Sequence, residues 1–282
     1  MKSRRLAIPY VIWMALFVIV PLILVVIYAF TSKDGGFTLE NFAGMGTYAK
    51  VFQQSFLLAF IATVICILIG YPLAYIMARE GPRFRKIAVI LIMLPMWMNF
   101  LLRTYAWMSL LENTGIINRL LSALGVFNLI NALFGTELTY FPMINTQGAV
   151  VLGMVYNYLP FMILPIFSVI EKIDPMVIEA AQDLGAGSAT VFRRIIVPLS
   201  VPGVISGIML VFIPSVSTFV ISQLLGGGMT MMLGDLIQTQ FLGNAYNPYL
   251  GSAISLVMMV IVLIAMAIMN RFGDGEEGAV MF

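Results

Sequence analysis

Six long stretches of this sequence contain almost no charged residues, and they constrain the fold more than any other feature. The first runs from Leu6 to Phe30 without an Asp, Glu, Lys or Arg. A helix of about 20 apolar residues crosses the hydrocarbon layer of a bilayer. Only 10% of the chain is charged, against about 25% in soluble globular proteins. We therefore predict an all-α membrane protein with about six transmembrane helices, near residues 7–30, 55–79, 86–111, 146–171, 201–223 and 250–270.

The positions of the lysine and arginine residues indicate how these spans are oriented. Eleven of the fifteen lie in the N-terminal segment, in the C-terminal tail, or around the connections that follow the second and fourth spans. Cytoplasmic loops carry an excess of Lys and Arg, so we expect both termini in the cytoplasm and an even number of spans. The first apolar stretch is longer than the core of about 7–15 residues in a cleavable signal peptide, so we expect it to be retained.

One further stretch, residues 116–134, is apolar enough to be considered as a seventh span. Polar residues interrupt it, among them Asn118, Arg119 and Asn131. A span here would also move the basic residues of the 172–200 connection to the outside, against the charge rule. We expect an interfacial helix, or two short helices, on the outer face.

The residues that most enzymes and metal sites use are scarce. The chain has no histidine and a single cysteine, Cys66, within an apolar stretch. A disulfide within the chain, a cysteine metal site and a histidine-based catalytic triad are therefore excluded. The phosphate-binding pattern GxxxxGK[ST] is also absent. We predict no catalytic residues, no metal site and no cofactor in this chain, and any ATP hydrolysis belongs to another chain.

The longest polar stretch on the predicted cytoplasmic side, residues 172–200, has the pattern of two short helices with a sharp corner. Asp174 is a good N-cap and Pro175 suits the first helical position. Gly185 or Gly187 supplies the left-handed residue that ends this helix near Leu184.

Ser188 can cap the second short helix, on which Val191 and Ile195 belong to an apolar face while Arg193 points elsewhere. The small side chains of the first helix allow close approach of a partner, and Glu179 and Asp183 place charges at its edge. An ordinary amphipathic connector is the alternative interpretation.

Glu179-Ala180-Ala181, followed after three residues by Gly185 and after nine more by Ile195-x-Val197-Pro198, resembles the EAA pattern of binding-protein-dependent ABC importers. The departure is Val197, where the family usually has Leu. The resemblance implies the type I ABC importer permease fold and assigns Glu179, Ala180, Ala181 and Gly185 to coupling with an ATPase.

The resemblance also implies the partners and the location of the chain. The expected partners are an ABC ATPase dimer that binds ATP and Mg, a second and non-identical permease chain, and an extracytoplasmic solute-binding protein, with no nucleic acid. The expected location is the bacterial plasma membrane. The segments 94–105, 156–160, 185–203 and 226–234 are similar to those of spermidine/putrescine permeases of the B type, which implies a polyamine cargo. Permeases for other small solutes share much of this pattern.

Polar groups within the apolar spans are candidates for a substrate path, because they are costly in lipid and tend to face cavities. They fall into one layer, slightly outward of the bilayer centre, and each cluster has a proline beside it, which bends a helix and exposes a carbonyl. Carbonyls, hydroxyls and aromatic faces suit a cationic amine. The same residue types also join packed membrane helices, and that alternative stays open. The candidates are Trp97, Asn99, Tyr156, Asn157, Tyr158, Ser215, Ser217 and Thr218.

Two acidic residues, Glu112 and Asp235, are candidates for an outer mouth that attracts a cation. Each can equally be a solvated loop charge, or pair with Arg103 or Arg119. Two other classes of function would need residues of a different kind. A membrane-embedded enzyme requires a nucleophile–base pair or paired carboxylates at depth, and an ion-driven secondary transporter calls for an intramembrane carboxylate and inverted repeats. The sequence offers none of these, so a transport subunit is the leading hypothesis.

Overall fold

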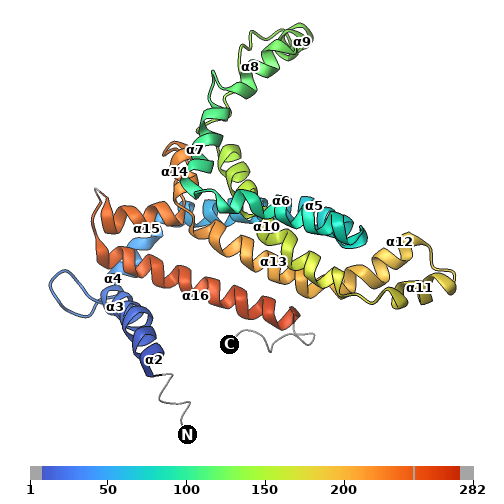
Figure 1. The fold of residues 1–282 in the computed structure, drawn as a ribbon. Helices are drawn as coiled ribbons and strands as arrows, with labels where there is room; N and C mark the ends of the chain where they lie inside the picture. Colours follow the sequence, from blue (N-terminus) through green and yellow to red (C-terminus); the bar gives the residue numbers. More distant parts are fainter. Residues whose placement is uncertain (1–7, 244, 274–282) are drawn as a thin grey trace.

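In the computed structural model, which describes residues 8–243 and 245–273, the chain is helical, and its one β contact is an isolated bridge between Thr31 and Phe37 (Figure 1). The helices are α2 (Ile8–Met14), the π-helix η1 (Ala15–Ile19), α3 (Val20–Ala29), α4 (Glu40–Gly44), the 3-10 helix η2 (Met45–Tyr48), α5 (Ala49–Arg79), α6 (Pro82–Trp97), α7 (Phe100–Leu111), α8 (Ile116–Ala123), α9 (Val126–Phe134), α10 (Gln147–Glu171), α11 (Pro175–Asp183), α12 (Ser188–Val191), the π-helix η3 (Phe192–Ile196), α13 (Val197–Ser217), α14 (Val220–Gly226), α15 (Leu233–Leu242) and α16 (Pro248–Gly273).

Within the described ranges, five continuous helical segments are long and apolar enough to cross a membrane, and a bent pair brings the number to six. This confirms the predicted all-helical class and the approximate number of spans. The chain termini lie outside the described residues, so their predicted cytoplasmic location stays a prediction. The segments are Ile8–Ala29, Glu40–Arg79, Gln147–Glu171, Ser188–Ser217 and Pro248–Met269, and the bent pair is Pro82–Trp97 with Phe100–Ala123.

Two of the predicted spans contain a break in the helix. The third, near 86–111, is interrupted between α6 and α7, and the axis bends by 90° there. Met98 is extended, with φ −77° and ψ 148°. Pro95 lacks an N–H and so weakens the last turn of α6. The fifth, near 201–223, is interrupted at Thr218, between α13 and α14.

The fifth span also begins earlier than the sequence suggests. The second short helix expected after the corner is not separate, because α12, η3 and α13 form one continuous helical segment from Ser188 to Ser217. Pro198 has no N–H for the usual bond to the preceding turn, and its ring crowds that carbonyl. A widened turn relieves the crowding, and in it the Val197 N–H bonds to the Phe192 carbonyl. A widened turn of the same kind, η1, precedes Pro21, and in it the Val20 N–H bonds to the Ala15 carbonyl.

The core forms where α5, α10 and α13 pack together. Met162 and Ile166 of α10 are fully buried there. Gly203 and Gly207 of α13 face them with the small-xxx-small spacing that brings membrane helices close together. A Cβ on Gly203 would lie 2.8 Å from the carbonyl oxygen of Pro165. The helices therefore touch through their backbones at this point.

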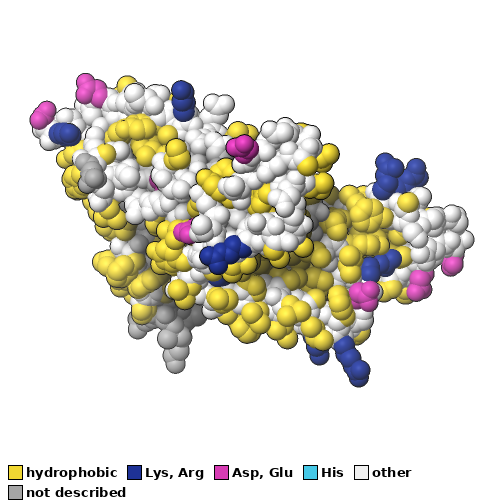
Figure 2. Space-filling model, turned by 90° about the horizontal axis from the view of Figure 1, so that it is seen from above, with side chains coloured by type: hydrophobic (Ala, Val, Ile, Leu, Met, Phe, Trp, Pro, Cys, Tyr) yellow, Lys and Arg dark blue, Asp and Glu magenta, His cyan; other side chains and the backbone are white. Residues whose placement is uncertain are grey.

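The other helices surround this core (Figure 1). Helix α3 packs against α16, where Tyr28 and Tyr249 meet edge to face. The stretch 116–134 forms two short helices, α8 and α9, joined through the left-handed Gly125, and they project as an arm beyond α7. The pair α11–α12 lies at the far end of α10 and α13 (Figure 1). Figure 2 shows hydrophobic side chains over much of one face, with charged groups gathered at a few places that include this end.

Candidate functional site: the α11 corner, the broken spans and the Glu112 pocket

The corner predicted in residues 172–200 is present. The Asp174 side chain accepts a hydrogen bond of 2.9 Å from the Met176 N–H and so caps α11. Gly185, and not Gly187, adopts the left-handed conformation, with φ +83°. The Ala186 N–H donates to the Ala181 carbonyl at 3.0 Å and the Gly185 N–H to the Gln182 carbonyl at 2.8 Å. These two bonds form a Schellman motif, which closes a helix on a left-handed glycine.

The predicted role of Ser188 is wrong. The N-cap of α12 is Gly187, which has no side chain to accept a bond, and Ser188 is the first residue within the helix. The expected apolar face of this segment is confirmed, since Val191 is buried and Ile195 packs against the core cluster. Arg193 is exposed, as expected.

The two faces of α11 differ in their surroundings. Ile178 is buried in the core cluster and Ala181 packs partly against it. On the other face Ala180 is exposed, and Leu184 is 90% exposed. Met176 is 71% exposed on the same side. Sequence reasoning missed the stripe 176, 180 and 184, although its spacing of four residues is the signal for one helix face. Glu179 and Asp183 are exposed beside it, and Gly185 follows it at the corner.

Arg85, which was not predicted as a site residue, binds three groups near α11, two at the end of α5 and one at the end of α10. Its Nη1 forms an ion pair with Glu171 Oε1 at 3.0 Å, at the end of α10. Its Nε donates to the Glu80 carbonyl at 2.9 Å and its Nη2 to the Ala78 carbonyl at 2.6 Å. No residue of α6 is buried. Arg85 therefore anchors α6, which has no buried residue, to α5 and α10.

The break between α6 and α7 exposes two of the predicted path residues. Trp97 is 75% exposed at the end of α6. Asn99 is also exposed, and its Oδ1 accepts hydrogen bonds from the Leu101 N–H at 2.9 Å and the Leu102 N–H at 3.4 Å. Asn99 thus caps the restarted helix, which is why the chain can turn sharply at this position.

The path residues of α10 have different surroundings. Tyr156 is half-buried and packs edge to face on Trp107, with ring centres 5.3 Å apart. Asn157 is buried, and its Nδ2 donates to the Gly153 carbonyl at 2.9 Å. Its Oδ1 has no partner among the described residues. Tyr158 hydrogen-bonds to the side chain of Thr218, so it connects α10 to the second helix break.

The residues around that second break are mostly buried. Ser215 is fully buried and donates to the Val211 carbonyl at 2.6 Å. Ser217 donates weakly to carbonyls of the preceding turn. Thr218 ends the helix in an extended conformation, and Gly234 packs directly on the carbonyls of Ser217 and Thr218. The breaks produce two half-helices, α7 and α14, which contact one another.

The two acidic candidates have different environments. Asp235 is 5% exposed, in the first turn of α15, and its Oδ2 accepts from the Met232 N–H at 2.8 Å. Burial raises the pKa of its carboxyl, and the nearby polar side chain of Ser222, the hydrogen bond from the Met232 N–H and the side chain of Gln223 oppose the rise. Asp235 is therefore a buried helix cap and not a solvated loop charge.

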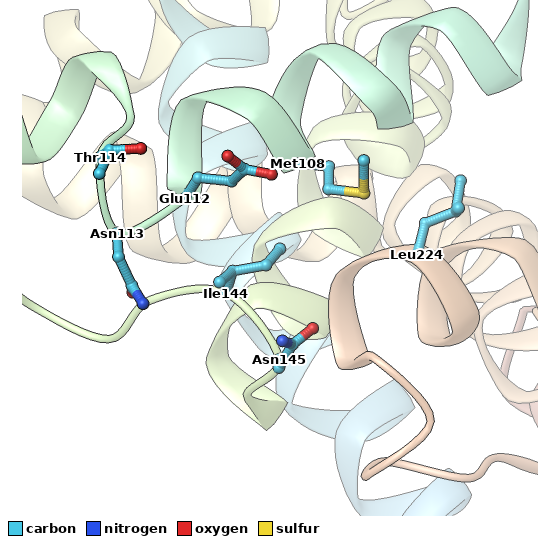
Figure 3. A pocket seen from close by; sticks show the side chains of 7 residues that line it. All are labelled: Met108, Glu112, Asn113, Thr114, Ile144, Asn145 and Leu224. Carbon is cyan, nitrogen blue, oxygen red and sulfur yellow. The ribbon is translucent and has the colours of Figure 1, made fainter.

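Glu112 is exposed at the end of α7 and lines a pocket of about 370 Å³ (Figure 3). In the described part of the chain, neither Glu112 nor Asp235 forms an ion pair with Arg103 or Arg119. Arg103 is instead buried over the ring of Phe100, 5.9 Å from its centre.

Comparison with known proteins gives a consistent result. Residues 70–275 match the family described as binding-protein-dependent transport system inner membrane component. The chain is 37% identical to a protein of Haemophilus influenzae named spermidine/putrescine transport system permease protein PotB, over 92% of this chain and 90% of that protein. The PotB protein of Escherichia coli K12 is 35% identical, with 89% and 90% covered.

Solved structures share the fold. A chain in the crystal structure of a bacterial ABC transporter involved in the import of the acidic polysaccharide alginate superposes with a TM-score of 0.80 at 16% identity, over 96% of this chain and 94% of that chain. At this identity the likeness establishes the fold alone, that of a type I ABC importer permease. From the extent of the family match and the identity to its relatives, we conclude that this chain belongs to the inner membrane components of binding-protein-dependent transport systems.

Proposed function

We propose that this chain is the permease subunit of an ATP-driven importer of polyamines such as spermidine and putrescine. The observation that carries the proposal is the identity of 35–37%, over about nine-tenths of the chain, to permeases named for spermidine and putrescine transport. The chain forms part of the translocation path and does not itself hydrolyse ATP. ATP and Mg are bound by a partner ATPase dimer.

The exposed stripe of α11 supports ATPase docking at this corner. Met176, Ala180 and Leu184 present apolar and small surface to solvent at a place where the chain is otherwise charged. Contiguous apolar surface outside the lipid region marks a protein contact site. Ile178 anchors the opposite face of α11 in the core. A displacement of α11 is therefore transmitted to α10 and to the helical segment that contains α13, because short connections join α11 to both.

The two helix breaks support a translocation path that passes beside them. Unwound backbone at membrane depth is tolerated where it is packed against protein or lines a cavity. Asn99 and Thr218 mark the two breaks, and Tyr158 lies against the second one. Exposed carbonyls and the face of Trp97 suit an alkylammonium ion, since cation–π contacts contribute about 0.5–2 kcal/mol. A second, non-identical permease chain completes the path, and ATP-driven closure switches its access between the two sides.

The distribution of Lys and Arg supports the orientation in the membrane. The chain crosses the bacterial plasma membrane several times with both termini in the cytoplasm, which places α11 on the ATPase side. The arm of α8 and α9 then lies on the outer side, where an extracytoplasmic solute-binding protein delivers the cargo.

Uptake into proteoliposomes tests this function. Vesicles contain this chain with its paired permease and ATPase, and the solute-binding protein is added outside. We expect ATP-dependent uptake of labelled spermidine or putrescine, with no uptake when the ATPase is omitted. Uptake without the ATPase would indicate an ion-driven carrier. ATP-dependent uptake that excess spermidine does not inhibit would indicate a related importer of another small solute, which a fold shared with an alginate importer also accommodates.

A further inference from the structure

The pocket beside Glu112 has the composition of a binding site and is formed by three separate parts of the chain. Glu112 ends α7, Asn145 lies in the connection before α10, and Leu224 belongs to α14. Figure 3 shows these side chains around one common space. The volume of about 370 Å³ lies within the range of about 300–1,000 Å³ for small-molecule pockets. Sequence reasoning placed Glu112 at an outer mouth but did not identify the pocket.

The electrostatics of the pocket favour a cation. The Glu112 carboxylate has no ion-pair partner in the described part of the chain, and no Lys or Arg lines the pocket. The pocket also adjoins the C-terminal end of α7, a helix of 12 residues, where the helix dipole is negative. Asn113 and Thr114 add oxygen acceptors beside the carboxylate. Glu112 is the one charged side chain in the lining, so an anion here would be repelled.

Asn145 is held in the pocket by a strained but well-supported backbone. Its φ of +62° makes it the one non-glycine residue with a left-handed conformation in the described ranges. Its N–H donates to the Leu225 carbonyl at 2.8 Å, which fixes the residue against α14. Gly227 packs so closely that a Cβ there would collide with the Asn145 side chain. Such strain costs about 1–3 kcal/mol and clusters at functional sites.

The remaining walls are apolar. Met108, Ile144 and Leu224 offer thioether and aliphatic surface, which suits methylene groups and leaves the hydroxyls of a sugar unpaired. A carboxylate and amide oxygens, together with aliphatic walls, match an ammonium group on an alkyl chain. Each of its three N–H donors can find an oxygen among Glu112, Asn145 and Thr114.

We propose that this pocket binds a primary alkylammonium group and, by doing so, bridges the two half-helices that follow the helix breaks. The inference rests on the proposed function. The pocket contacts α7, which follows the break at Asn99, and α14, which follows the break at Thr218. An ammonium group held here links the positions of both breaks. The group can come from the end of a free polyamine or from a lysine side chain of the docked solute-binding protein.

Two measurements on the reconstituted importer complex in nanodiscs test the pocket and distinguish these sources. The first is binding of labelled putrescine to the complex without solute-binding protein. The second is the concentration of solute-binding protein that half-maximally stimulates ATP hydrolysis. We expect Glu112→Gln to weaken putrescine binding, to raise the half-maximal concentration of solute-binding protein, or to do both, by about tenfold or more. The reason is that a hydrogen bond to a charged group is lost. Weaker putrescine binding identifies the free amine as the ligand. A higher half-maximal concentration identifies a lysine side chain of the solute-binding protein as the ligand.

Matched variants complete the test. Glu137→Gln removes an exposed carboxylate of the connection between α9 and α10 that does not line the pocket, and we expect both measurements to stay within twofold of wild type. Asn145→Gly keeps the left-handed backbone, removes the amide and should weaken the same measurement as Glu112→Gln. The pocket proposal is overturned if Glu112→Gln and Asn145→Gly both match wild type in both measurements. Failure of the proposed function is separate, because it appears as a wild-type complex that does not take up polyamine at all.

Discussion

Two glycines at the α11 corner differ in backbone conformation, and this predicts different effects when each is replaced by alanine. An added Cβ would meet nothing within 4 Å at either Gly185 or Gly187. Gly185 has φ +83°, whereas Gly187 is extended with φ −68° and ψ 159°. Alanine in the left-handed region costs about 1–2 kcal/mol. Alanine at Gly187 should be close to neutral, because its restriction of the unfolded chain offsets the lower preference for alanine at the N-cap of α12.

The cost at Gly185 converts directly into a measurable rate. A change of about 1–2 kcal/mol shifts an equilibrium by a factor of about 5–30. The Ala186 N–H, bonded to the Ala181 carbonyl at 3.0 Å, exchanges its hydrogen when the corner opens. Hydrogen exchange of peptides covering this corner, in the reconstituted complex, should therefore accelerate about 5–30-fold in Gly185→Ala and less than twofold in Gly187→Ala.

The same pair of variants tests coupling. If the corner positions α11 against the ATPase, Gly185→Ala should lower the number of solute molecules imported per ATP hydrolysed, while Gly187→Ala should not. Gly185→Asn should fall between them, since asparagine tolerates the left-handed conformation better than alanine does. Equal exchange rates in Gly185→Ala and Gly187→Ala would refute the argument from backbone conformation.

Three further predictions concern the anchor, the core and the buried carboxyl. Arg85→Ala should lower import per ATP hydrolysed with little change in melting temperature, because a partly exposed ion pair contributes about 0.2–1 kcal/mol. Arg83→Ala, which alters an exposed neighbour, serves as its control, and equal effects would exclude a specific anchor. Gly203→Ala places a Cβ against a backbone carbonyl of α10 and should destabilise the helix pair by about 1–3 kcal/mol, whereas Gly46→Ala, with nothing within 4 Å, should not. The raised pKa of Asp235 means that its protonated form favours folding and that stability falls as pH rises above the ordinary value of 3.8. Asp235→Asn keeps an acceptor for the helix cap and should raise the melting temperature at pH 7 but not at pH 4; a lower melting temperature at pH 7 would contradict this.

Much of the fold could be predicted because hydropathy and turn chemistry are local. The apolar stretches are long enough to identify the spans, and Asp174 with Gly185 marks the ends of α11 without knowledge of any distant contact. Local sequence preferences predict a helix cap less reliably where two neighbouring residues could both serve as the N-cap. Gly187 caps α12 although Ser188 is the better capping residue by type.

The remaining features depend on contacts between distant parts of the chain. Arg85 and Glu171 are 86 residues apart, so neither stands out in its own segment. Asp235 looks like a loop charge until α14 and α15 are folded around it. The break at Asn99 leaves the hydropathy of the span unchanged, and its nearby proline is also common in unbroken membrane helices. The pocket at Glu112 exists only because α14 packs against the end of α7.

The central claim is that the exposed face of α11 docks on a separate ATPase. A photoreactive amino acid at position 180, on that face, tests it in membranes that contain the whole importer. Position 133, exposed on the arm of α9, provides the matched control at the other end of the molecule. We predict ultraviolet cross-linking to the ATPase from position 180 and none from position 133. Cross-linking to the ATPase from position 133 and not from position 180 would contradict the account.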